Sequence, residues 1–397
     1  MEKILISVKK INLEKLIPLI FSLIVIVKYE PAPFDVLLMG LFIICLLVFG
    51  IKREFMFLIL GLFIIELISV LNGAFLGRIN YRYILIDIYL YLGFFTTLTF
   101  LYYFKDKKSV LIEKIFIAFT IACFVTLLIY SFVVLTDIQI PGFNITYGKL
   151  RMQGFFKDPN VAGPFFILPY LFWLNKMIDR EDGVFDKKSF LIAFFLAVGV
   201  LASFSRAAYL NMFLGTVILG IYYFKNILLI IKKNYRWFIF CLIGIVLIFV
   251  VIYAIDNRYL TLFLNRLHLQ SYDENRFTGQ LEVISMLSEN PILGIGVGNY
   301  KDVADIAAHS LYFRILGEFG ILGFVLMMGS VFTVYTYSII RRIHILPIAI
   351  FGGLLLNSFF VDTLHWRSFW FVLAWIIVEL LNTMEKDKQV KEVYHGK

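Results

Sequence analysis

The chain alternates between long apolar blocks and short polar or charged connections along almost its whole length. The blocks are about 17–25 residues long, the length that a helix needs to cross the hydrocarbon core of a membrane. They lack the residue-by-residue alternation of a membrane β-barrel, so helices are expected rather than strands. The predicted spans are residues 13–28, 34–51, 55–71, 83–104, 111–135, 160–177, 189–204, 207–224, 237–255, 310–338, 345–361 and 368–383.

Composition agrees with this pattern. The chain is 61% hydrophobic and 16% charged, whereas soluble domains are about 45–50% apolar and about 25% charged. We therefore predict an all-α polytopic membrane bundle of about twelve transmembrane helices, with residues 1–397 as a single integral membrane domain. Cys45, Cys123 and Cys241 lie within apolar blocks and are expected to be buried free thiols. The charged N-terminal stretch leads directly into the first span, so we expect an uncleaved first helix.

The basic residues predict an orientation. With the N-terminus in the cytoplasm, 24 of the 37 lysine and arginine residues fall in cytoplasmic segments, as the positive-inside rule requires. An even number of spans returns the C-terminus to the same side. The prediction is therefore a multi-pass protein with both termini in the cytoplasm.

Arginine does not follow the bias of lysine. Nine of the fourteen arginines fall on the predicted outer side. Because guanidinium groups bind phosphate and carboxylate in a bidentate manner, an arginine-rich outer face indicates an anionic ligand. Interfacial snorkelling and ion pairing are the alternative for part of this set. The nine are Arg78, Arg82, Arg151, Arg206, Arg258, Arg266, Arg276, Arg314 and Arg367.

The first of two long predicted outer loops, residues 136–159, ends at the start of a helix. Asp158 is a favourable N-cap residue and Pro159 a favourable first helical residue. A plain helix start is one interpretation of this motif; the other adds Arg151 and Asn160 facing a polar cavity beside the helix.

The second long outer loop, residues 256–309 between the ninth and tenth spans, contains more candidate chemistry. Arg276 precedes a stretch whose apolar stripe is typical of a helix lying along a membrane surface. Gly294 and Gly296 allow close backbone approach to a ligand. His309 lies at the mouth of the tenth span, where an imidazole can exchange protons near neutral pH.

Each candidate also has a structural interpretation. Arg206 lies in a tight turn between two spans and either binds an anion or pairs with an acid. His309 is either a catalytic group or a helix cap. Arg314 and Glu318, at an i, i+4 spacing, are expected to form a structural pair. Residues 362–367 either line the same cavity or form an interfacial belt. Three acids in apolar blocks are expected to pair within the bundle: Glu66, Asp87 and Glu379.

Four segments together resemble the O-antigen ligase and O-antigen polymerase superfamily of bacterial surface-polysaccharide synthesis. In family order they are residues 154–160, Ser205 with Arg206, Arg276 ahead of residues 291–296, and residues 309–323. The last two segments are the most specific. Ser310 departs from the pattern, because the family often has Asn after the histidine.

The resemblance implies a GT-C-like glycosyltransferase in the bacterial inner (plasma) membrane that acts on undecaprenyl-pyrophosphate-linked glycan at the outer leaflet. Arg206 and Arg276 would hold the pyrophosphate. His309 would orient or deprotonate the acceptor hydroxyl, or act beside a base that does. Transfer would proceed with inversion and without a metal or other cofactor, because arginines supply the positive charge. The further candidate substrate-binding residues are Arg151, Asn160, Gly294, Gly296, Tyr312 and Arg367.

Several functions remain open. A polymerase passes the glycan to the next lipid-linked repeat unit, whereas a ligase passes it to lipid A-core. The segment at residues 155–160 and the many Phe and Tyr residues favour a polymerase by analogy. The expected partners are the lipid-linked oligosaccharide, the bilayer and a chain-length regulator, without nucleic acid. A flippase or other transporter is less consistent with charge gathered in two loops, and an assembly scaffold would not need the Arg and His set.

Overall fold

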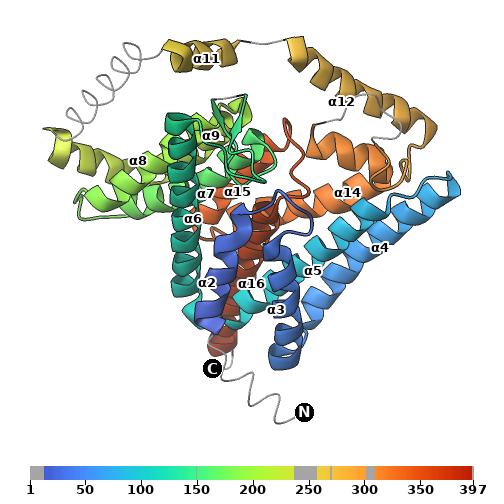
Figure 1. Ribbon diagram of the computed structural model, residues 1–397. Helices are drawn as coiled ribbons and strands as arrows, with labels where there is room; N and C mark the ends of the chain where they lie inside the picture. The colour runs from blue at the N-terminus through green and yellow to red at the C-terminus, as the bar shows by residue number, and fades with distance from the viewer. Residues whose placement is uncertain (1–12, 149, 237–256, 269–270, 301–308, 396–397) are drawn as a thin grey trace. The chain divides into compact units, whose positions relative to one another are not determined.

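The computed structural model in Figure 1 describes residues 13–148, 150–236, 257–268, 271–300 and 309–395, and it leaves out the side chains of 257–260, 267, 271–276, 391 and 393–395. The secondary structure of these residues is helical apart from one antiparallel hairpin, β1 (Thr146–Tyr147) with β2 (Arg151–Met152), and the helices are joined by turns and irregular segments. The predicted helical class is confirmed, and the hairpin in the first long loop was not predicted. Two compact units are present: Met1–Phe119 with Glu274–Lys397 (unit 1), and Thr120–Asp273 (unit 2).

Unit 1 contains helices from both ends of the chain. Helix α5 is its centre and packs against α3, α4 and α16. Aromatic rings fill the interior, where Phe21 contacts Phe100, Phe119 and Phe371. The elements are α2 (Leu13–Ser22), η1 (Leu23–Val25), α3 (Pro33–Phe49), α4 (Arg53–Phe75), α5 (Tyr81–Tyr103), η2 (Lys105–Lys107), the first part of α6 (Lys108–Thr136), most of α12 (Ser271–Glu289), α14 (Leu311–Ile340), α15 (Ile345–Asn357) and α16 (Arg367–His395).

Unit 2 is built around α7 (Pro159–Ile178), which packs against α8 (Lys187–Ala202) and α9 (Arg206–Tyr222). Small residues allow close approach: a Cβ on Gly163 would lie 2.9 Å from the Cβ of Ala208. Helix α9 is followed, after an 88° bend, by a helix at Phe224–Arg236. Unit 2 also contains the rest of α6, the β1–β2 hairpin and helix α11 (Asn257–Leu267).

The helices agree with a membrane protein. Among the described residues, six helices are long and apolar enough to cross a membrane, or seven if the bent pair is one span. Helices α3 and α15 are apolar but shorter. The predicted ninth span, residues 237–255, lies outside the described residues. The total of about twelve spans therefore stays a prediction.

Buried polar groups are paired much as the sequence predicts. Glu379 binds Lys108 at 2.7 Å. Glu66 accepts a hydrogen bond from Tyr91 at 3.2 Å, and Asp87 contacts His365. Of the predicted buried free thiols, Cys45 and Cys123 are confirmed, whereas Cys241 lies outside the described residues.

Candidate functional site

The predicted site residues are distributed over both units. Arg151, Asn160 and Arg206 belong to unit 2, whereas Arg276, Gly294, Gly296, His309, Tyr312 and Arg367 belong to unit 1. Within each unit the structure brings some of them into direct contact.

In unit 2, Arg151 contacts both the start of α7 and the turn before α9. Its Nε donates to the Ser203 carbonyl at 3.1 Å, and its Nη2 donates to Asn160 Oδ1 at 3.3 Å. The guanidinium also lies over the Tyr147 ring, 5.5 Å from the centroid. These bonds orient the buried guanidinium through neutral oxygen atoms. The structure thus brings Arg151 and Asn160 into direct contact, and the polar cavity expected beside them stays a prediction.

The start of α7 is fixed by its cap. Asp158 adopts an extended backbone conformation, and its Oδ1 accepts the Asn160 N–H at 2.7 Å, with Pro159 as the first helical residue. The predicted N-cap is therefore confirmed. It holds the Asn160 side chain at the helix mouth, where Arg151 reaches it.

Arg206 is the first residue of α9. Ser205 caps the helix by accepting the Ala208 N–H at 3.4 Å. The half-buried Arg206 side chain donates from Nη1 to the His268 carbonyl at 3.1 Å. A guanidinium at a helix N-terminus adds its charge to the positive end of the helix dipole, so this position favours an anion.

In unit 1, the glycine-rich loop at residues 291–298 forms backbone hydrogen bonds on both sides of a break in α14. Gly320 has φ 65° and ψ −171°, which interrupts the helix. On one side of the break, Ile295 N and Gly296 N donate to the carbonyls of Gly317 and Glu318. On the other side, the amides of residues 321 and 322 donate to the carbonyls of residues 291 and 292. The loop thus satisfies backbone groups that the break exposes.

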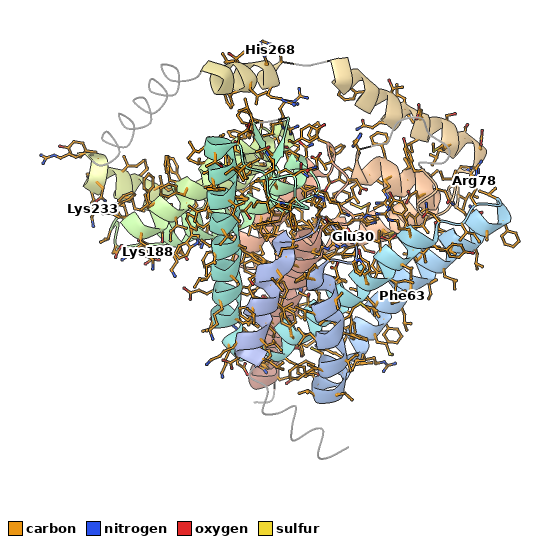
Figure 2. All side chains as sticks on the ribbon, in the orientation of Figure 1. Glu30, Phe63, Arg78, Lys188, Lys233 and His268 are labelled. Carbon is orange, nitrogen blue, oxygen red and sulfur yellow. The ribbon has the colours of Figure 1, made fainter. Side chains whose placement is uncertain are left out.

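Helix α4 and the residues after it also bind this loop. Asn72 Nδ2 donates to the Gly294 carbonyl at 2.6 Å, and Asn80 Nδ2 donates to the Gly298 carbonyl at 3.1 Å. Asn299 Nδ2 contacts the carbonyl of Arg78, the residue labelled beyond the end of α4 in Figure 2, at 3.3 Å. The loop is therefore hydrogen-bonded to α14 on one side and to α4 and the residues after α4 on the other.

The predicted glycines have a packing role in this arrangement. Gly294 has φ 72°, and a Cβ there would lie 2.5 Å from the Gly317 carbonyl oxygen. Gly296 has φ 90°, and its Cβ would lie 2.6 Å from the Cα of Gly73. The close backbone approach is thus made to α14 and α4. A contact of either glycine with a ligand stays a prediction.

His309 precedes Ser310, the N-cap residue of α14. It is exposed and has φ 46°, a left-handed conformation that non-glycine residues rarely adopt. The next two residues are anchored, because Ser310 Oγ and Leu311 N both donate to the Ser358 carbonyl, at 3.2 and 2.9 Å. The backbone that presents His309 is therefore fixed from its C-terminal side to the end of α15.

Arg276 lies in α12, and its side chain is outside the described residues. Helix α12 has the predicted apolar stripe, with Phe277, Leu281 and Ile284 exposed. On its other side Val283 and Met286 are buried against Ile295 and Tyr300. Placement of the exposed stripe on a membrane surface stays a prediction.

Two other candidates are buried in the fold. Tyr312 donates from its hydroxyl to the Leu355 carbonyl at 2.7 Å. Arg367 binds Glu30 and Asp35, each at 2.6 Å; Glu30 is labelled in Figure 2. Both contacts hold α14 or α16 to neighbouring segments. A substrate contact of Tyr312 or Arg367 stays a prediction.

An ion-pair group lies at the end of unit 1 where α14 begins. The predicted Arg314–Glu318 pair is confirmed at 3.1 Å, and Arg314 Nη1 also binds Asp362 Oδ2 at 2.7 Å. Burial acts to raise the pKa of Asp362, but the charges of Arg314 and His365 and the bonds donated to the carboxylate outweigh it. The pKa of Asp362 therefore lies below its usual value.

The contact between His365 and Asp87 was not predicted from the sequence. The two lie far apart in the chain, and each appeared in a separate prediction, Asp87 as a bundle acid and His365 in the 362–367 cluster. The structure places Nε2 of His365 3.0 Å from Asp87 Oδ1. The sequence feature that points to this contact is Asp87 itself, because an isolated acidic residue in an apolar helix needs a polar partner.

Unit 1 also has an apolar cleft of about 480 Å³. It lies between α4, α14 and α16, three of the helices that are long enough to cross a membrane. Leu311 and Leu364 line it, and they are close in sequence to His309 and Asp362. No group of three or more His, Cys, Asp or Glu side chains in the described part of the chain is arranged to hold a metal ion.

Comparison with known proteins identifies one family. Residues 191–328, about a third of the chain, match the family model described as O-antigen ligase. Searches of curated proteins and of solved structures found no match. The match includes Arg206, Arg276 and His309, and it confirms the resemblance to the O-antigen ligase and polymerase superfamily. The match indicates a function of the O-antigen ligase or polymerase type.

Proposed function

We propose that this protein is a polysaccharide polymerase of the bacterial inner membrane. It transfers undecaprenyl-pyrophosphate-linked glycan to the next lipid-linked repeat unit on the outer face of the membrane. The observation that carries the proposal is the family match over residues 191–328, because this segment contains both pyrophosphate-binding arginines and the histidine of the resemblance. A bundle of about twelve spans with a GT-C-like arrangement and cytoplasmic termini completes the proposal.

The chemistry assigned to the site is substitution at the anomeric carbon with inversion. Arg206 and Arg276 bind the pyrophosphate and stabilise its charge as it departs, so no metal is required. Arg151 and Asn160 support the Arg206 turn from the start of α7. His309 orients the acceptor hydroxyl. The position of Arg206 at the N-terminus of α9 supports this role, since the helix dipole also favours an anion there.

The apolar cleft is the place we assign to the lipid tail of a substrate. Its lining is almost entirely aliphatic and aromatic, and it lies within helices of membrane-spanning length. Leu311 and Leu364 form part of the lining near the end of unit 1 that carries His309. A polyprenyl chain in the cleft would keep its pyrophosphate at that end.

The decisive experiment is deletion of the gene, with analysis of surface polysaccharide on a gel. A polymerase mutant leaves single repeat units attached to the lipid A-core where a ligase is also present. A ligase mutant leaves the core bare, and that result would replace the polymerase assignment with the second candidate function, which has the same family match. Complementation with the intact chain must restore the original ladder.

A flippase or other transporter is the alternative from another class. A deletion mutant of a transporter accumulates lipid-linked repeat units on the cytoplasmic face of the membrane, whereas a polymerase mutant accumulates them on the outer face. A sidedness assay with a membrane-impermeant oxidant therefore separates the two. Accumulation on the cytoplasmic face would overturn the enzyme assignment.

A further inference from the structure

His365 and Asp87 form an imidazole–carboxylate pair in unit 1. His365 Nε2 lies 3.0 Å from Asp87 Oδ1, with 17% of the His365 side chain exposed and none of the Asp87 side chain. A buried carboxylate bound to one ring nitrogen selects the tautomer that carries its hydrogen there, and it stabilises the imidazolium ion once a second proton arrives. The other ring nitrogen is then a proton acceptor.

The orientation of this imidazole is fixed by further contacts. The ring stacks on Tyr83 with centroids 5.6 Å apart and an interplanar angle of 28°. The backbone carbonyl of His365 accepts a bond from Arg367 Nη1 at 3.2 Å, and Arg367 is itself held by Asp35. A pre-oriented base loses little freedom when it accepts a proton, so rigidity at this position favours proton transfer.

The pair lies at the end of unit 1 that carries His309. The segment between α15 and α16, which contains His365, binds the first turn of α14 through Ser358. Asp362 in the same segment binds Arg314 on the next turn of α14. Two histidines on different elements are therefore tied to the same helix start.

The surroundings of the pair contain more acidic than basic groups. Within the described residues, Asp87 Oδ2 and Glu66 Oε1 are buried without a hydrogen-bond partner. The charged and titratable groups around the pair are Glu66 on α4, Tyr83 and Tyr91 on α5, Arg314 and Glu318 on α14, Asp362 in the connecting segment and Arg367 on α16.

We propose that His365, held by Asp87, is the base that accepts the proton of the acceptor hydroxyl. This inference rests on the proposed glycosyl transfer. The hydroxyl oxygen forms a bond to the anomeric carbon while the bond from that carbon to the pyrophosphate oxygen breaks, and the electron pair leaves with the pyrophosphate. The hydroxyl proton passes to Nδ1 of His365, and water later removes it from the partly exposed ring. Asp87 acts as a positioning residue.

The test uses the full-length protein in nanodiscs with lipid-linked repeat units extracted from cells that lack it. Initial rates of chain extension are measured between pH 5 and 9. We expect His365→Gln to lower the rate by about 10²–10⁴-fold, the usual contribution of a general base. His365→Gly should recover activity when imidazole is added, in proportion to the concentration of the neutral imidazole.

Asp87→Asn supplies a readout that a purely structural role would not change. Without the carboxylate the imidazolium ion is less stable, so the acid limb of the rate profile should move to lower pH while the maximum rate falls. His344→Gln is the matched control, because His344 caps α15 by accepting the Leu346 N–H. Its profile should equal that of the unchanged protein.

The outcomes separate this inference from the proposed function. If the unchanged protein forms no extended product, the proposed function fails. If it is active and a folded His365→Gln variant keeps its rate and profile, the inference fails while the function stands. Should the His365 variants not fold, an unmoved acid limb in Asp87→Asn would overturn the inference.

Discussion

The arginines of the two units differ in the partners that the structure describes for them. In unit 1, Arg314 binds Glu318 and Asp362, and Arg367 binds Glu30 and Asp35. In unit 2, the described bonds of Arg151 go to a backbone carbonyl and an amide oxygen. Those of Arg206 likewise include a carbonyl. Carboxylates neutralise a guanidinium, whereas neutral oxygens only orient it.

This difference distinguishes two uses of arginine that look the same in the sequence. All four residues belong to the arginine excess on the predicted outer side. The ion pairs of Arg314 and Arg367 hold helices together, since separating either from its carboxylates would leave buried charge. The described bonds of Arg151 and Arg206 orient the two guanidinium groups, and anion binding by either residue stays a prediction. Changes at Arg367, Arg206 and Asp362 test this division, and a change at Gly294 tests the packing of the glycine-rich loop.

The largest expected effect is on stability. Arg367→Ala leaves the Glu30 and Asp35 carboxylates buried without their partner, which should lower the free energy of unfolding by about 3–5 kcal/mol. Thermal unfolding of the detergent-purified protein measures the change. Arg341→Ala is the control, because its pair with Asp387 is exposed and should contribute about 0–1 kcal/mol. Unchanged stability together with lost chain extension would instead place Arg367 on the substrate.

The next effect is on activity. Arg206→Ala should reduce chain extension by about 100-fold or more, because it removes a donor to the departing pyrophosphate, while the amount of protein in the membrane stays the same. A gel of surface polysaccharide and a quantitative blot measure the two quantities. Arg180→Ala in the same unit is the control, since Arg180 forms an exposed pair with Asp182. A normal ladder from Arg206→Ala would contradict its assignment.

The third effect is a loss of stability caused by poorer packing of the glycine-rich loop against α14. Gly294→Ala places a methyl group 2.5 Å from the Gly317 carbonyl oxygen at a backbone φ of 72°. We expect a loss of about 1–3 kcal/mol in stability, the usual consequence of overpacking. Gly40→Ala provides the comparison, because a Cβ there meets nothing within 4 Å. Equal melting temperatures for both variants would show that the loop moves away easily from α14.

The smallest effect depends on pH. The pKa of Asp362 is below its usual value in the folded protein. Its contribution to stability is therefore complete above the unfolded pKa of about 4 and is lost as the pH falls through the folded pKa. We expect about 1 kcal/mol, since the carboxylate is partly exposed. Melting temperatures between pH 7 and pH 3 should fall more for the unchanged protein than for Asp362→Asn, and parallel curves would contradict this.

The sequence predicts the helices well because continuous apolarity of the right length is a strong local signal. It also predicts the cap at Asp158 and the pair of Arg314 with Glu318, which depend on neighbours in the chain. Contacts between distant segments leave no such signal. The pairing of residues 291–296 with α14 and the bond between His365 and Asp87 depend on how helices pack, which apolar pattern alone does not specify.

The break in α14 has a consequence for how the protein is made. Four backbone bonds join the two sides of the break to the loop at residues 291–296. In a lipid environment those groups would otherwise lack partners, so the broken helix is stable only with the loop in place. The loop precedes α14 in the chain and is therefore synthesised first. During translation the loop is therefore already present when α14 is made, and it can form hydrogen bonds with both sides of the break as the helix folds.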